Sequence, residues 1–145
     1  MAFHFSLATV LRVRVITEER EEGILQKILF NISKVFDDLE RIDSRIEEAD
    51  DSRHAEVLKP CIGLDVHACY GAVKELKQCR KDLEDKIQKL EEARDKQLAI
   101  YEAAKRNREM LTDMREKKRI AYEIEMNKRE QKTLDDNYIS RRGRS

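Results

Sequence analysis

The sequence predicts an all-α protein that folds as a long antiparallel coiled coil of two helices. Only four glycines and one proline occur in 145 residues, and 41% of the residues are charged. So few turn-forming residues do not suit the tight connections that strands need, whereas interleaved charges suit solvated helices. In addition, apolar residues recur three and four positions apart in two separate stretches. This spacing is typical of a coiled-coil seam.

The first helix is predicted to begin near Ser6 and to end near Asp51. A mean apolar spacing of about 3.5 residues underwinds a helix slightly and favours a left-handed coiled coil with a partner helix. Towards the start, the same register passes through Glu21 and Glu18 before it becomes apolar again at Leu11. The uninterrupted part of the seam consists of Leu25, Ile28, Ile32, Val35, Leu39, Ile42, Ile46 and Ala49.

A bend is predicted over residues 52–65, where the apolar period is lost. The segment contains Pro60 and Gly63. Proline lacks a backbone donor and clashes with the preceding helical turn, so a continuous helix through residue 60 is disfavoured. Asp65 is a candidate to cap the second helix.

The second helix is predicted over residues 66–138 and is followed by a basic tail at 139–145. Arg80 forms a polar layer in its seam, and Arg94 and Gln97 interrupt the seam again. Glu125 and Arg129 are spaced to support the helix as an i,i+4 ion pair. The apolar seam positions are Cys69, Val73, Leu76, Leu83, Ile87 and Leu90.

Two such stripes on either side of a short bend can pack against each other within one chain, so we expect a single hairpin domain and a monomer. At 1.5 Å per residue the helices would span roughly 65–70 Å and roughly 105–110 Å. The start of the first helix would then cover the patch from Tyr101 to Leu111, and the end of the second would extend beyond it. The alternative is a homodimeric scaffold in which the stripes pair between chains.

No pattern in the sequence points to catalysis, a cofactor or a metal. The isolated glycines form no phosphate-binding loop. Side chains that can bind zinc gather around the bend, but their spacing fits no compact zinc site; they are His54, Cys61, His67 and Cys69. The acidic run at 47–51 lacks the alternation of a calcium loop. We therefore predict that the chain is not an enzyme.

The sequence also argues against nucleic acid and against a membrane span. Arg141, Arg142 and Arg144 stand without interleaved aromatic residues, a weak basis for nucleic-acid binding. No apolar run approaches the roughly 20 residues that cross a bilayer. The N-terminal stretch, which includes Arg12 and Arg14, could lie on a membrane surface, but packing into the coiled coil is favoured. An odd cysteine count without a secretory signal predicts a cytoplasmic protein.

The two ends of the chain resemble the FliJ family of the bacterial flagellar export apparatus, which has relatives in virulence type III secretion. The opening "FHFSLATVLRVR" follows the family pattern at Phe3, Phe5, Leu7, Val10, Leu11 and Arg14. Near the other end "REQKTLDD" is similar to the family's Glu-Gln-Lys-x-x-Asp-Glu motif at Glu130, Gln131, Lys132 and Asp135, with Asp136 in place of the final Glu. These residues do not separate flagellar from virulence systems.

The resemblance implies a stalk like the central shaft of rotary ATPases, inserted into a hexameric export ATPase of the FliI type. It also implies contacts with an export gate of the FlhA type and with export chaperones, at the cytoplasmic face of the inner membrane. The ring-facing end would comprise Phe3, Phe5, Leu7, Arg129, Glu130, Gln131, Lys132, Asp135 and Asp136.

Overall fold

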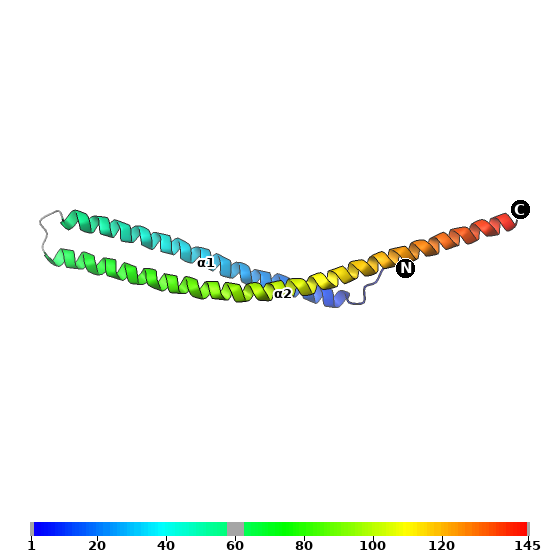
Figure 1. Ribbon diagram of the computed structural model, residues 1–145, viewed down its shortest axis with the longest axis horizontal. Helices are drawn as coiled ribbons and strands as arrows, with labels where there is room; N and C mark the ends of the chain where they lie inside the picture. Colours follow the sequence, from blue (N-terminus) through cyan, green and yellow to red (C-terminus); the bar gives the residue numbers. More distant parts are fainter. Residues whose placement is uncertain (1, 58–62, 145) are drawn as a thin grey trace. The chain divides into compact units, whose positions relative to one another are not determined.

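The structure, a computed structural model, describes residues 2–57 and 63–144 and contains two long helices, α1 (Ala8–Val57) and α2 (Gly63–Gly143). The helices pack against each other, which confirms the predicted all-α hairpin (Figure 1). Contacts divide the chain into a terminal unit, Met1–Arg20 with Glu102–Ser145, and a hairpin unit, Glu21–Tyr101.

Both helices extend beyond the predicted limits. α1 continues through Val57 rather than ending near Asp51, and α2 begins at Gly63 and runs to Gly143. Residues 52–57 contain neither glycine nor proline, so local propensity carries α1 onward. Asp65 lies inside α2 and is not its cap. Residues 58–62, which include the predicted break at Pro60, lie outside the described residues.

The core of the hairpin unit is a narrow apolar seam. Val35 and Val73 are the most deeply buried of its described side chains, with 3% and 4% of their surface exposed. Leu25, Ile32 and Ile87 are also buried. The other apolar seam residues with described side chains are half-buried: Ile28, Leu39, Ile42, Ile46, Ala49, Leu76, Leu83 and Leu90. Each helix thus shields only one stripe of the other.

A buried polar layer interrupts this seam at Gln97. Its amide Nε2 donates a hydrogen bond of 3.1 Å to the backbone carbonyl of Glu21 and a second one to the Glu21 carboxylate. Arg80, predicted as another polar layer, is half exposed, and its Nε lies 3.0 Å from the Asp43 carboxylate across the hairpin. Polar partners at fixed positions favour one alignment of two helices, because sliding would separate them.

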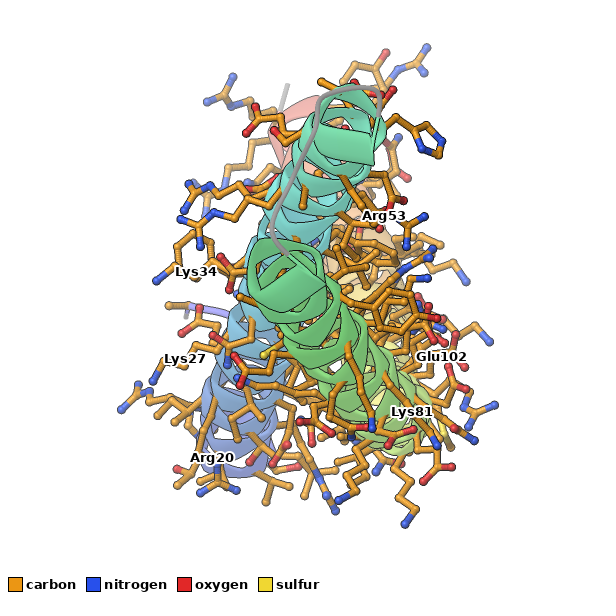
Figure 2. All side chains as sticks on the ribbon, turned by 90° about the vertical axis from the view of Figure 1, so that its left-hand side faces the viewer. Arg20, Lys27, Lys34, Arg53, Lys81 and Glu102 are labelled. Atoms are coloured by element: carbon orange, nitrogen blue, oxygen red, sulfur yellow. The ribbon has the colours of Figure 1, made fainter. Side chains whose placement is uncertain are left out.

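Charged side chains surround the seam of the hairpin unit. Lys27 and Lys34 point outward from α1 (Figure 2). The Lys34 ammonium lies 4.7 Å from the centre of the exposed Phe30 ring. Near the bend, the Arg53 guanidinium lies 5.5 Å from the ring of Tyr70 on α2. In both contacts a cation lies over an aromatic ring outside the seam, and each ring residue still exposes 60% of its surface.

Candidate functional site

The N-terminal segment packs onto α2 within the terminal unit through its two phenylalanines. Phe5 is 4% exposed, and the Lys118 ammonium lies 5.6 Å from the centre of its ring. The Phe3 and Tyr122 ring centres are 5.6 Å apart, at an interplanar angle of 48°. The backbone NH of Ala8, the first residue of α1, donates to the Phe5 carbonyl at 3.1 Å. The segment is therefore held at both ends, by its aromatic rings and by the start of the helix.

The start of α1 was predicted to cover the patch from Tyr101 to Leu111. In this patch Ala104 is buried, and Tyr101 and Leu111 are half-buried. The two phenylalanines, which precede α1, contact α2 further along, at Lys118 and Tyr122. Tyr122 precedes Arg129 by about two helical turns. The α2 residues that contact the phenylalanines thus precede the motif at residues 129–136 along the helix.

A partly buried ion pair fastens α1 to α2 within the same unit. The Arg108 guanidinium donates two hydrogen bonds to the Glu18 carboxylate, one of them of 3.2 Å from Nη2 to Oε1. The side chains of Arg108 and Glu18 are 27% and 13% exposed. Two parallel bonds from a planar guanidinium fix both distance and orientation. Glu18, predicted only as a polar position in the seam, therefore contributes a directional contact.

The motif-like residues at 129–136 lie on a fully exposed part of α2. Every described side chain from residue 127 to residue 144 is exposed. The Arg129 Nη2 lies 2.7 Å from the Glu125 carboxylate, which confirms the predicted i,i+4 pair. The Gln131 amide donates to Asp135 over 3.4 Å, and the Thr133 hydroxyl donates to the Arg129 carbonyl at 2.9 Å. These bonds are local to the helix and leave its surface accessible.

The exposed end of α2 also carries large apolar side chains, which were not predicted from the sequence. Leu134, Tyr138 and Ile139 expose 65%, 63% and 67% of their surface. The Arg142 guanidinium lies 6.0 Å from the centre of the Tyr138 ring. The spacing of four residues between Leu134 and Tyr138 places both on one helix face and was the signal that could have revealed them. This surface therefore combines charge with bulky apolar side chains.

A charge cluster occupies the same stretch of α2 as the aromatic contacts with Lys118 and Tyr122. Arg119 lies between Glu116 and Glu123, one turn away on either side, and forms ion pairs with both. The hydrogen bond from Arg119 lowers the pKa of Glu116 below its usual value of 4.5, and the charges of Arg119 and Arg115 act in the same direction. Glu116 and Glu123 in turn raise the pKa of Arg119. These interactions therefore favour the charged forms of Glu116 and Arg119.

The described residues offer no grouping of ligands for a metal ion. His54 is exposed, and the side chains of Cys61, His67 and Cys69 lie outside the described residues. In the part of the chain that the structure describes, no helix is long and apolar enough to cross a membrane.

The chain matches one protein-family model, described as "FliJ: Flagellar FliJ protein", over residues 3–145. Neither the curated proteins nor the solved structures contain a match.

Proposed function

Because the chain belongs to the flagellar FliJ protein family, a component of the flagellar export apparatus, we propose that it acts there as the stalk of a hexameric export ATPase of the FliI type. The exposed end of α2 would enter the ring. The observation that carries this proposal is that every described side chain at residues 127–144 is exposed while the helix continues without a break. A helix with no packing partner of its own is suited to being gripped by another protein.

Two sets of residues would form the ring-facing surface. Arg129, Glu130, Gln131, Lys132, Asp135 and Asp136 supply ionic and amide groups. Phe3 and Leu7, which are half-buried, would face the ring beside them, and the buried Phe5 would hold the segment in place. Exposed Leu134 and Tyr138 add apolar area. Charged contacts with a polar collar give orientation and reversibility, and the apolar residues add affinity.

The proposed mechanism supplies no catalytic group. A stalk that binds the assembled ring more tightly than free ATPase subunits shifts the population towards the ring. The shift is limited by the difference between the two affinities. Hydrolysis then rises because more of the ATPase is in its active assembly.

The experiment uses the intact chain and its cognate ATPase. The variant Glu130→Ala/Lys132→Ala/Asp135→Ala removes three exposed charges from the proposed surface. The matched control, Asp37→Ala/Glu48→Ala/Lys81→Ala, makes the same change in charge at exposed positions of the hairpin unit. With each exposed contact contributing up to about 1 kcal/mol, we expect roughly tenfold weaker stimulation of ATP hydrolysis by the first variant only. Equal stimulation by both variants, with equal helicity, would remove the assigned surface.

We also propose that the chain works in the cytoplasm, at the inner face of the membrane, where it contacts an export gate of the FlhA type and export chaperones. Family membership supports these partners, and the membrane association would come through them. Pull-down of each purified partner by the intact chain tests each contact separately. Retention of none of them would limit the function to the ATPase.

A further inference from the structure

The terminal unit contains a hollow of about 450 Å³ beside the first turns of α1. Its apolar wall includes Phe3, Phe5 and Leu11, and its polar rim includes His4, Arg12 and Arg115. The hollow lies between the N-terminal segment, α1 and α2 of this unit. Its volume is large enough for one or two side chains of another molecule.

The hollow has a small residue, Ala8, among bulky ones. Ala8 and Leu11 are three residues apart in the first turns of α1 and share one helix face, and Phe5 lies in the segment before the helix. All three line the hollow. Phe5 and Leu11 are buried, but a methyl group at position 8 cannot fill the distance between them. Apolar walls that lack contact atoms on one side lose packing energy. An apolar side chain from outside would restore those contacts.

The rim carries one sign of charge. None of the described residues that line the hollow is acidic, although the chain as a whole has 30 acidic and 30 basic residues. Arg12 and Arg115 are both exposed, and the structure describes no ion pair for Arg12. Glu116, the nearest acid to Arg115 in sequence, bonds to Arg119 instead. Lys118, beside Phe5, adds a further cation next to the hollow.

This combination selects a particular ligand chemistry. A guanidinium is planar, and its paired N–H donors match the two oxygens of a carboxylate. The guanidinium groups of Arg12 and Arg115 can therefore bind one or two carboxylates. The apolar wall behind them accommodates a bulky aliphatic or aromatic group. We propose that the hollow binds a peptide segment of a partner protein in which an acidic residue stands next to a bulky apolar one. The proposal does not rest on the ATPase, because the binding is a property of this chain alone.

The test measures binding of fluorescein-labelled peptides to the intact protein by fluorescence anisotropy. The probe is Gly-Ser-Gly-Asp-Leu-Phe-Asp-Gly-Ser-Gly. One comparison peptide carries Lys in place of both Asp residues, and another carries Ser in place of Leu and Phe. We expect the probe to bind with a Kd of about 10–100 μM and both comparison peptides to bind at least tenfold more weakly. Equal binding of all three would overturn the proposal.

Substitutions then locate the binding. Arg12→Gln/Arg115→Gln is expected to weaken probe binding at least tenfold. The control Arg14→Gln/Arg106→Gln removes the same charge from exposed positions of the same helices that do not line the hollow, and should change the Kd by less than twofold. Ala8→Leu fills the hollow without altering charge and should also abolish binding. Circular dichroism checks that each variant keeps its helicity.

Two further outcomes are decisive. If the protein ignores the peptides but binds phosphatidylglycerol vesicles in a manner that needs Arg12 and Arg115, the occupant is a lipid and the peptide proposal fails. The variant Glu130→Ala/Lys132→Ala/Asp135→Ala should bind the probe normally, so failure of the stalk function and failure of the hollow are distinguished. Loss of probe binding in that variant would contradict the assignment to the hollow.

Discussion

At the scale of single residues, two polar contacts fasten α1 to α2 more specifically than the apolar seam does. Gln97 is 8% exposed and bonds to Glu21, within the hairpin unit. Arg108 bonds to Glu18, within the terminal unit. Apolar seams tolerate sliding by one heptad, because each apolar layer resembles the next. A hydrogen bond between one particular donor and one particular acceptor is lost when the helices slide. These contacts therefore favour a single register.

The first prediction concerns Gln97. Gln97→Leu keeps the side-chain volume but removes the amide that bonds to the Glu21 carbonyl and carboxylate. We expect the free energy of unfolding to fall by about 1–2 kcal/mol, because a partly buried acceptor loses its donor. Urea denaturation measures the change. The double variant Gln97→Leu/Glu21→Leu should recover the part of the loss that comes from the carboxylate, since both side-chain polar groups are then gone and only the Glu21 backbone carbonyl remains. A single variant as stable as the parent would contradict this account.

The second prediction concerns pH and Glu116. A carboxyl whose pKa is lowered in the folded state contributes stability that is fully present above its unfolded pKa, near 4.5. That contribution declines as the pH falls below 4.5 and is lost below the lowered pKa. NMR titration of the Glu116 carboxyl should show a pKa below 4.5 that returns towards it in Arg119→Gln, while Arg129→Gln leaves it unchanged. An unaltered Glu116 titration in Arg119→Gln would refute the assigned cause.

At the scale of the helix, α2 changes character along its length. In the hairpin unit one stripe is covered by α1, whereas at residues 127–144 every described side chain is exposed. An isolated helix of that length is marginal in water because nucleation is costly. Here the packed part of α2 supplies the nucleus, and i,i+4 contacts such as Glu125–Arg129 add a few tenths of a kcal/mol each. Order in the exposed part therefore depends on the turns that precede it.

The third prediction follows from this gradient. Backbone amides at residues 127–144 should exchange with solvent at least 100-fold faster than those around Val35 and Val73, whose side chains are buried. Exchange should accelerate from residue 127 towards residue 143, because each further turn lies farther from the packed part of α2. Hydrogen exchange followed by mass spectrometry measures both effects. Uniform protection along α2 would show that the exposed part is stabilised by something other than its own turns.

At the scale of the whole molecule, folding leaves an unusually large surface in water. The chain exposes 11913 Å² for a mass of 17.2 kDa, whereas a compact protein of that mass exposes about 7,800 Å² and the unfolded chain about 25,000 Å². Folding thus buries about half of the chain's surface instead of the usual 70% or so. Even Val35, the most buried described core residue, keeps 3% of its surface exposed.

The fourth prediction is a low heat capacity of unfolding. Because the heat capacity change scales with the surface exposed on unfolding, we expect about 9–11 cal/mol/K per residue in place of the usual 12–15 or so. Differential scanning calorimetry at two protein concentrations gives the value and tests for dimers, whose melting temperature would rise with concentration. The prediction fails if the heat capacity change per residue lies within or above the usual range at both protein concentrations. Such a result would mean that the folded chain buries more surface than this structure shows.

Much of this fold is readable from the sequence, because the two apolar stripes depend on spacing alone. The all-α hairpin follows from them, and the seam residues with described side chains are buried or half-buried. The helix ends and the cross-helix partners of Phe3 and Phe5 depend on where the bend falls, which no local pattern fixes to within a turn. The hollow beside Ala8 was equally inaccessible, because it depends on which side chains of α2 face the first turn of α1.

The exposed end of α2 has a consequence for the lifetime of the protein in the cell. Its lysines and arginines lie on a part of α2 whose described side chains are all exposed, and proteases cleave where a helix opens most readily. We expect proteases to cut a chain there first when no partner protein is bound to the exposed end of α2, and we expect a chain with a bound partner to survive. Turnover would then adjust the number of copies to the number of partners available to hold them.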